Sequence, residues 1–224
     1  EFLNTKKLKA KKLSVAIQGF GAVGSAIARL LFQDGFRIVG LSDSRGAILR
    51  PEGIDIEETI RVQQERGLVN QRPCSLEEAS GEKCRVATNE ELLEAEVDVL
   101  IPAALENAIT ADNAGRIKAK VILEMANGPV TAEADTILAS HDIAVIPDIL
   151  ANSGGVVGSY FEWVQGLARF YWEEDEVFSR IEKIMAKAFL AVAAEEAKGG
   201  TWRDASYRLA VRRVADAMRL RGWT

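Results

Sequence analysis

The chain has 224 residues, and 48% of them are hydrophobic, which is enough apolar surface to bury a substantial core. Its formal net charge of −5 at pH 7 argues against a protein that binds nucleic acid or a membrane through a broadly basic surface. The sequence contains no apolar run long enough to cross a bilayer and no signal-peptide pattern at its start, so we expect a cytoplasmic protein.

Residues 1–12, EFLNTKKLKAKK, are rich in lysine. Such a run can be an anion-binding arm or a solvated connector, and the acidic balance of the remaining chain favours the connector. We therefore expect residues 1–12 to be a linker that follows a further, N-terminal domain.

Residues 13–43 read as an apolar strand, a glycine-rich turn, an amphipathic helix, a second apolar strand and an acid. Gly19, Gly21 and Gly24 have the spacing G-x-G-x-x-G, and Asp43 follows about 20 residues further on. In this context the glycines allow a tight turn and a close approach of backbone to a pyrophosphate, which would lie at the start of the helix, and the acid can bind ribose hydroxyls. The pattern predicts a Rossmann dinucleotide-binding unit; the alternative is a βαβ unit without a ligand.

Later helices are predicted by their caps. Asp55 with Glu58 and Thr88 with Glu91 have the form of capping boxes, and Thr110 and Thr131 are candidate N-caps. Residues 67–82 between them are polar and irregular, which is typical of a surface excursion.

The two cysteines, Cys74 and Cys84, lie in or next to this excursion. Two cysteines in an acidic chain of this length favour free thiols in a reducing compartment. The alternative, a disulfide that closes a short loop, is geometrically allowed.

Three further apolar runs, at 97–102, 121–124 and 143–147, read as strands that are covered on both faces. With the first two strands they give five or six strands that alternate with helices. We therefore predict an α/β fold: a Rossmann-like, doubly wound, mostly parallel sheet with long C-terminal helices.

The period changes after residue 147, and we assign 13–150 to a Rossmann core and 151–224 to helices that complete the domain and its cleft. An aromatic cluster in this part can be a ligand box or a helical packing face, and we favour the packing face. Its members are Tyr160, Phe161, Trp163, Phe170, Tyr171 and Trp172. On the last helix, one face is predicted to hold Tyr207, Ala210, Val211, Val214 and Met218.

Short polar segments follow the strands, where an open α/β sheet binds its ligands. They are SDS at 42–44, PAALEN at 102–107, MANGP at 125–129 and PDILANSGGVVGSY at 147–160. Asn127 and Asn152 can each donate and accept hydrogen bonds, which suits a carboxamide or a ribose. Either segment alone could be turn chemistry, but two on successive strand ends favour a cofactor cleft.

With QGFGAVG, SDSRG, IPAALEN, ANGP, PDILANSGGV, SYFEWVQ and LAVRRVADAMRLRG in this order, the chain resembles the nucleotide-binding domain of the glutamate, leucine, phenylalanine and valine dehydrogenases. The resemblance covers nearly all of residues 13–222, and the ANSGGV–SYFEWVQ combination is similar to the glutamate branch. It implies oxidative deamination of L-glutamate to 2-oxoglutarate and ammonia, with hydride passing to a nicotinamide.

The resemblance also implies site residues. Those of the pyrophosphate would be Gly19, Phe20, Gly21, Ala22, Val23 and Gly24, and those of the adenosine ribose Asp43 and Ser44. The rest of the dinucleotide would meet Ala103, Ala104, Asn127 and Asn152, and the substrate would meet Val156 and Ser159. Asp43 favours NAD because a carboxylate repels a 2′-phosphate, whereas Arg45 could pair with that phosphate and leaves NADP as the alternative.

Two positions depart from the family pattern. Ala22 stands where many members have Asn, and Met125 stands where Gly is usual before ANGP. Both departures put the strength and shape of cofactor binding in doubt.

The resemblance also implies a separate N-terminal domain that supplies the substrate-binding lysines and the catalytic lysine and aspartate, and a full-length protein that forms a homo-oligomer. This chain offers no counterpart of those residues, so we expect no catalytic residue and no turnover from it alone. Lys118, Lys120 and Lys183 read as surface charges, and His141, the one histidine, reads as a loop residue rather than a general base. With a single histidine we also expect no metal site.

Two functions remain open. The chain is the cofactor half of an NAD-dependent glutamate dehydrogenase, or it is a stand-alone dinucleotide-binding protein that regulates or supports an enzyme without turnover. The retained Ser159 favours the first, because a pure binding module has no use for a substrate contact.

Overall fold

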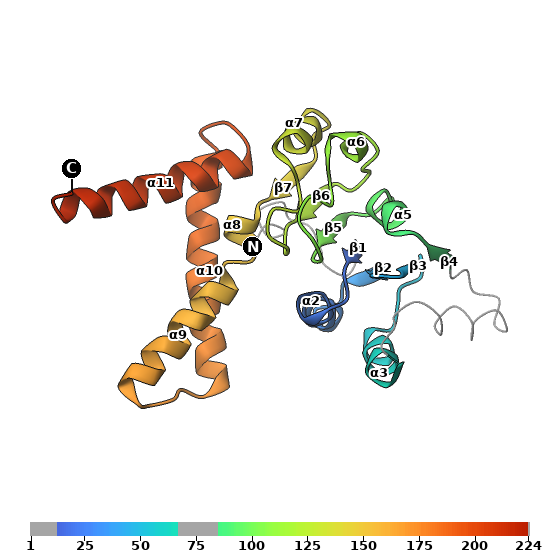
Figure 1. Ribbon diagram of the computed structural model, residues 1–224, viewed down its shortest axis with the longest axis horizontal. Coiled ribbons are helices and arrows are strands. Elements are labelled where there is room, and N and C mark those ends of the chain that lie inside the picture. Colours follow the sequence, from blue (N-terminus) through green and yellow to red (C-terminus); the bar gives the residue numbers. More distant parts are fainter. Residues whose placement is uncertain (1–12, 67–84, 224) are drawn as a thin grey trace. The chain divides into compact units, whose positions relative to one another are not determined.

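The computed structural model describes residues 13–66 and 85–223 (Figure 1). The linker predicted at 1–12, the excursion predicted at 67–82 and both cysteines lie outside the described residues. The chain divides into two compact units, one up to Val145 and one from Ile146 onward, and each is described by itself.

The first unit is built on a sheet of seven strands among the described residues, in the order β4-β3-β2-β1-β5-β6-β7. The strands are β1 (Ser14–Gln18), β2 (Arg37–Asp43), β3 (Gly46–Leu49), β4 (Arg85–Ala87), β5 (Val99–Pro102), β6 (Val121–Leu123) and β7 (Ala144–Ile146). β2, β1, β5 and β6 pair in parallel, whereas β3 runs antiparallel to β2 and β4. The mostly parallel, doubly wound α/β fold predicted from the sequence is confirmed.

The antiparallel strands β3 and β4 were not predicted. β3 follows β2 through a two-residue turn, in which the Asp43 carboxylate accepts a hydrogen bond from the Arg45 N–H at 2.8 Å. The four residues of β3, GAIL, are too short a run for a strand to be identified by periodicity. In addition, the turn before β3 is closed by the Asp43 side chain, for which the sequence predicts only a ligand-binding role.

Helices cover both faces of the sheet. Side chains alternate along β1: Val15 and Ile17 join an apolar cluster with helices α2 (Ala22–Gln33) and α3 (Ile56–Arg66), and Ala16 joins the cluster on the opposite face. The helices of that opposite face are α5 (Asn89–Leu93), α6 (Ala111–Ala114) and α7 (Ala132–Ser140). Burying a side chain such as Ile17 contributes about 1.5–3 kcal/mol, so this alternation fixes the register of the central strand.

The predicted caps explain where several helices begin. Thr88, Thr110 and Thr131 are N-caps of α5, α6 and α7, and Thr88 forms a full capping box with Glu91. The box predicted at Asp55 is half formed: its carboxylate accepts the Glu58 N–H at 3.0 Å, but the Glu58 carboxylate binds Arg61 instead.

The second unit consists of α8 (Asp148–Ala151), α9 (Gly154–Ala168), α10 (Glu174–Glu196) and α11 (Trp202–Leu220) (Figure 1). Gly154 and Gly158 of α9 face Ile181 of α10, and a Cβ at either position would lie 3.8 Å from the Ile181 side chain, an ordinary contact distance. The buried Gln165 closes the connection, since its Oε1 accepts the Trp172 N–H at 2.6 Å. None of the described helices is both long and apolar enough to cross a membrane.

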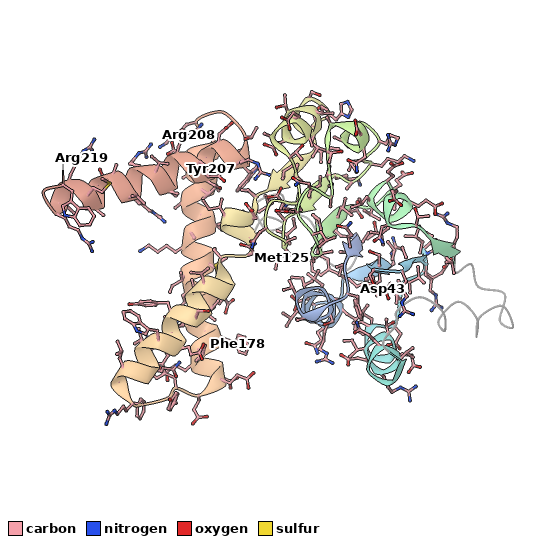
Figure 2. The ribbon with its side chains drawn as sticks, in the orientation of Figure 1. Asp43, Met125, Phe178, Tyr207, Arg208 and Arg219 are labelled. Carbon is pink, nitrogen blue, oxygen red and sulfur yellow. The ribbon has the colours of Figure 1, made fainter. Side chains whose placement is uncertain are left out.

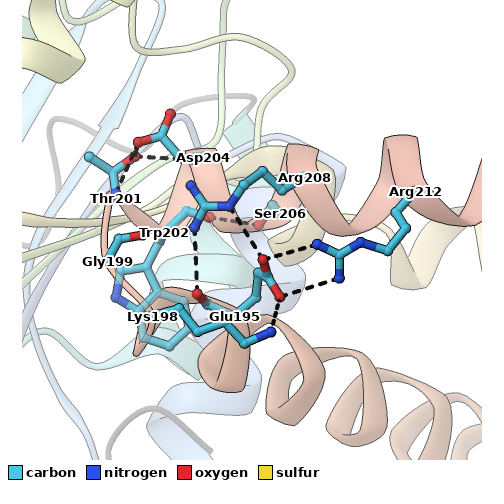
Figure 3. A network of polar contacts seen from close by, with 9 residues as sticks. All are labelled: Glu195, Lys198, Gly199, Thr201, Trp202, Asp204, Ser206, Arg208 and Arg212. Atoms are coloured by element: carbon cyan, nitrogen blue, oxygen red, sulfur yellow. Dashed lines mark hydrogen bonds and ion pairs between the residues drawn. The ribbon is translucent and has the colours of Figure 1, made fainter.

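A network around Glu195 joins α10 to α11 (Figure 3). The Glu195 side chain is 7% exposed and receives Lys198 at 2.7 Å, Arg208 at 3.4 Å and Arg212 at 3.3 Å. Hydrogen bonds from Lys198 and Arg212 lower the pKa of Glu195 to about 2. Nearby, the rings of Phe189 and Trp202 stack with centroids 5.3 Å apart. The corner between the two longest helices is therefore held by both charge and apolar contact.

The predicted aromatic packing face is only partly correct. Phe161 is 6% exposed and its ring meets that of Trp172 at 5.4 Å, as expected of a packing pair. The other four members are more than half exposed: Tyr160, Trp163, Phe170 and Tyr171. On α11 the predicted face is also exposed at Tyr207, Val211 and Val214, because only the first turns of this helix pack on α10.

Candidate functional site

The candidate site lies at the carboxyl edge of the sheet, where the strand order reverses between β1 and β5. In doubly wound sheets this reversal opens a crevice that binds ligands. Gly19 follows β1, and a Cβ built on it would lie 2.7 Å from the Cβ of Ala104, which follows β5. The Ala103 N–H donates to the Gln18 carbonyl at 2.8 Å, so the ends of the two strands are fastened to each other.

Each glycine of the turn meets a different constraint. Gly19 has φ +92°, a conformation that costs other residues about 1–2 kcal/mol. A Cβ on Gly24 would lie 1.8 Å from the Gly19 carbonyl oxygen, so only glycine fits there. Gly21 differs from both, because a Cβ on it would meet nothing within 4 Å. The first and last glycines are required by the turn itself, and the middle one leaves open space beside the backbone.

Helix α2 starts at this open space. Its N-cap, Gly21, provides no side-chain hydrogen bond, and its first turn carries no acidic residue. The first N–H groups of a helix have no partner within the helix, and the helix dipole adds partial positive charge there. Gly21, Ala22 and Val23 are all exposed, so their backbone can meet an anion from solvent.

Asp43 ends the neighbouring strand β2 and is half-buried (Figure 2). Besides the Arg45 N–H on its carboxylate, its backbone carbonyl accepts the Asn89 side-chain amide at 3.0 Å. Ser44 beside it is exposed. Directly before Asp43, the hydroxyl of the fully buried Ser42 accepts a hydrogen bond from the Gly19 N–H at 3.2 Å. The strand end that carries the acid is thus tied to the glycine turn.

The segments that follow β5 and β6 lie side by side and are joined by backbone hydrogen bonds. The N–H groups of Met125 and Ala126 donate to the Pro102 carbonyl at 3.0 and 2.9 Å, and the Asn107 N–H donates to Gly128 at 2.8 Å. Asn127 is exposed in this paired loop. Met125 is partly buried against the apolar cluster of β1 and α2 (Figure 2).

The first unit therefore brings most of the predicted cofactor residues to one edge of the sheet. They are Gly19, Phe20, Gly21, Ala22, Val23, Gly24, Asp43, Ser44, Ala103, Ala104 and Asn127. The other three predicted residues belong to the second unit. Asn152 is the C-cap of α8, and Val156 and Ser159 lie one turn apart and exposed on α9.

The side chains set aside as surface groups are exposed: Lys118, Lys120, Lys183 and His141. Lys120 binds the Asp98 carboxylate at 2.6 Å, and His141 caps the end of α7 before β7. Burial raises the pKa of Asp98, but hydrogen bonds from Lys120 and Ser14 outweigh it and hold this pKa below its ordinary value. The contacts of Asp98 with Lys120 and Ser14 lie at the opposite, amino edge of the sheet.

Sequence analysis missed three side chains that hold the candidate site: Ser42, Gln63 and Asn89. Ser42 lies in the SDS segment and could have been suspected as a buried hydroxyl at a strand end. Gln63 donates to the Phe20 carbonyl at 2.5 Å from α3, and no local pattern signals a contact between residues 43 positions apart.

Several known proteins are similar to this chain in sequence or fold. The profile of the glutamate/leucine/phenylalanine/valine dehydrogenase family matches residues 1–222. Glutamate dehydrogenase of Thermotoga maritima is 52% identical over 214 residues, which are 95% of this chain and 49% of that protein. NAD-specific glutamate dehydrogenase A of Halobacterium salinarum is 47% identical over 210 residues, 93% of this chain and 46% of that protein.

A solved structure is also similar. The hetero-hexameric glutamate dehydrogenase of Thermus thermophilus, in its leucine-bound form, superposes with a TM-score of 0.87 at 32% identity. The superposition covers 98% of this chain and 50% of that chain. The chain thus spans about half the length of the relatives it matches.

Proposed function

The chain belongs to the glutamate/leucine/phenylalanine/valine dehydrogenase family, and we propose that it is the dinucleotide-binding part of a glutamate dehydrogenase that uses NAD. The observation that carries the proposal is the glycine turn at the point where the strand order reverses. The glutamate branch is supported by the names and identities of the relatives, and NAD by the name of the Halobacterium protein.

The residues of the turn fit a dinucleotide. The open space at Gly21 and the uncapped start of α2 suit a pyrophosphate, and the Asp43 carboxylate at the end of β2 suits ribose hydroxyls. When bound, NAD supplies the hydride acceptor. In this proposal the chain's own residues bind and orient it.

The roles are assigned as follows. Backbone of Gly19, Phe20, Gly21, Ala22, Val23 and Gly24 binds the pyrophosphate, Asp43 and Ser44 bind the adenosine ribose, and Ala103, Ala104 and Asn127 line the remaining path. Asn152 as a cofactor residue and Val156 and Ser159 as substrate residues rest on the family resemblance alone. The Ser159 hydroxyl would donate to the distal carboxylate of glutamate.

The reaction proposed for the whole protein is oxidative deamination of L-glutamate to 2-oxoglutarate and ammonia. It needs a lysine to stabilise the developing charge and an acid to transfer protons. We assign both groups to residues outside this chain, in the half of the relatives that it does not match. Residues 13–150 would form the cofactor core and 151–224 would complete the domain.

The test is calorimetric titration of NAD into the chain and into Gly21→Val. The unmodified chain should bind NAD, and Gly21→Val should lose more than roughly tenfold in affinity, because a branched side chain fills the space that the phosphates need. Gly21 has open surroundings, so the variant should fold normally.

Gly115→Val is the matched control, since Gly115 also has nothing within 4 Å of a built Cβ but lies at the end of α6. It should bind NAD as the unmodified chain does. Absence of NAD binding by the unmodified chain, or normal binding by Gly21→Val, would show that the assignment of the turn is wrong.

A further inference from the structure

The peptide groups of the glycine turn are held by backbone and side-chain groups from outside the turn. The unit between Gln18 and Gly19 is fastened on both sides: the Gln18 carbonyl accepts Ala103 N–H at 2.8 Å, and the Gly19 N–H donates to Ser42 at 3.2 Å. The Gly21 carbonyl accepts both the N–H and the hydroxyl of Ser25, at 2.9 and 2.7 Å. Between these two units, the Phe20 carbonyl accepts the side-chain amide of Gln63 at 2.5 Å.

The Gln63 contact sets the direction of an N–H group. In a trans peptide unit the carbonyl and the N–H point in opposite directions. Because the Phe20 carbonyl is drawn toward Gln63, the N–H of Gly21 in the same unit points away from α3. By the same reasoning Ser25 turns the Ala22 N–H outward. These two groups stand at the start of α2, where an anion is favoured.

Gln63 is itself well positioned. Ile56, Ile60 and Gln63 are spaced at i, i+4 and i+7 along α3 and so share one face. Ile56 and Ile60 are buried in the apolar cluster that includes Ala28 of α2. Therefore, the face of α3 that packs on the core also presents the Gln63 amide to the turn.

Two further contacts hold α3 in place. At the start of α3, the Asp55 carboxylate accepts a hydrogen bond from the Glu58 N–H. Glu57 of α3 forms an ion pair with Arg29 of α2 at 3.3 Å. The helix that carries Gln63 is therefore tied to the helix whose first turn is proposed to meet the phosphates.

We propose that Gln63 is a positioning residue for the pyrophosphate: it orients the Gly21 N–H by holding the Phe20 carbonyl. This inference rests on the proposed function, since it concerns the same dinucleotide site. A donor fixed before binding does not have to be ordered during binding, so its loss weakens ligands that carry phosphate. It leaves a ligand without phosphate unaffected.

The experiment compares NAD with adenosine, which carries the ribose and base but no phosphate. Gln63→Met keeps the length of the side chain and removes the donor. Its affinity for NAD should fall about three- to tenfold, the loss expected for one hydrogen bond, while its affinity for adenosine stays unchanged. Gln63→Glu, which keeps polarity but cannot donate when ionised, should lose at least as much affinity for NAD and again none for adenosine.

Gln33→Met is the matched control, because Gln33 is exposed at the far end of α2. It should leave both ligands unaffected. Circular dichroism of each variant checks that it is folded.

Unchanged NAD affinity in both Gln63 variants, or an equal loss for NAD and adenosine, would overturn the positioning role while the proposed function stands. Failure of the unmodified chain to bind NAD would overturn both, and it is seen before any variant is made.

Discussion

At the residue scale, Asp43 has one structural task and one proposed binding task. Its carboxylate closes the turn into β3 by accepting the Arg45 N–H, and its position at the end of β2 suits it to ribose hydroxyls. The hydrogen bond holds the side chain before any ligand arrives. Arg45 takes part through its backbone, and its exposed side chain remains available to a 2′-phosphate.

Asp43→Ser should narrow the difference between NAD and NADP. Removing the carboxylate should weaken NAD by about tenfold or more, as expected for hydrogen bonds to a charged group, while NADP should bind at least as well as before. Calorimetric titration of both cofactors into both proteins measures the change.

Asp34→Ser controls for the loss of one negative charge. Asp34 is exposed at the C-cap of α2, about 18 Å along the helix from the turn. The Asp34→Ser variant should keep the preference of the unmodified chain for NAD over NADP. If NADP binds the unmodified chain as tightly as NAD, the assignment of NAD is wrong.

At the scale of the elements, the sequence predicted best where the signal is local. The helix starts at Thr88, Thr110 and Thr131 were predicted correctly. An N-cap can be identified locally because its side chain bonds only to backbone N–H groups in the next turn of the chain. β3 and β4 were not predicted because they are defined by pairing with partner strands and not by the pattern of their own four and three residues.

The apolar faces were harder still. Spacing predicted that Tyr207, Val211 and Val214 share a face of α11, but it could not tell whether a neighbour covers that face. In its own unit the face is exposed. Periodicity reports which residues lie together on a helix, and burial depends on what the rest of the fold places against them.

The corner between α10 and α11 gives a prediction for pH. The folded pKa of Glu195 is about 2, below the ordinary 4.5, so its stabilising contribution is complete above about pH 4.5 and is lost as the pH falls toward 2. Glu195→Gln should lower the melting temperature at pH 7 by at least roughly 2–4 °C, and this difference should shrink between pH 4.5 and 2.

Glu196→Gln, one residue further on, is the matched control and should change the melting temperature little. Thermal unfolding followed by circular dichroism at several pH values measures both variants. A constant difference between Glu195→Gln and the unmodified protein down to pH 2 would contradict the charge-based account of this corner.

At the scale of the whole molecule, the candidate site is a set of strand ends contributed from distant parts of the chain. The sequence could name Gly19, Asp43 and Asn127 because parallel strands must end at one edge. It could not name Gln63 or Asn89, whose side chains reach the site from helices through contacts that only the folded chain brings about.

The chain by itself should bind NAD without measurable glutamate-dependent reduction of it. Loss of a general acid–base group typically costs about 10²–10⁴-fold, and here both the lysine and the aspartate are proposed to lie elsewhere. Absorbance at the wavelength of NADH measures turnover. Vigorous oxidation of glutamate by these 224 residues would mean that lysines described as surface groups perform the chemistry.

Adding the separately expressed N-terminal half of the Thermotoga maritima relative should restore some turnover. In the mixture Ser159→Ala should raise the KM for glutamate more than it lowers kcat, whereas Ser140→Ala, at the end of α7, should change neither. A mixture that binds NAD but stays inactive would favour a stand-alone binding protein.

The boundary between Val145 and Ile146 also determines what spectroscopy can see. All four tryptophans of the chain, at 163, 172, 202 and 223, lie after it, so the unit with the glycine turn contains none. Intrinsic tryptophan emission therefore reports on the helical unit alone, and the sheet must be followed by another signal. The difference in emission between the unmodified chain and a variant with a single tryptophan introduced into the first unit would report on the sheet.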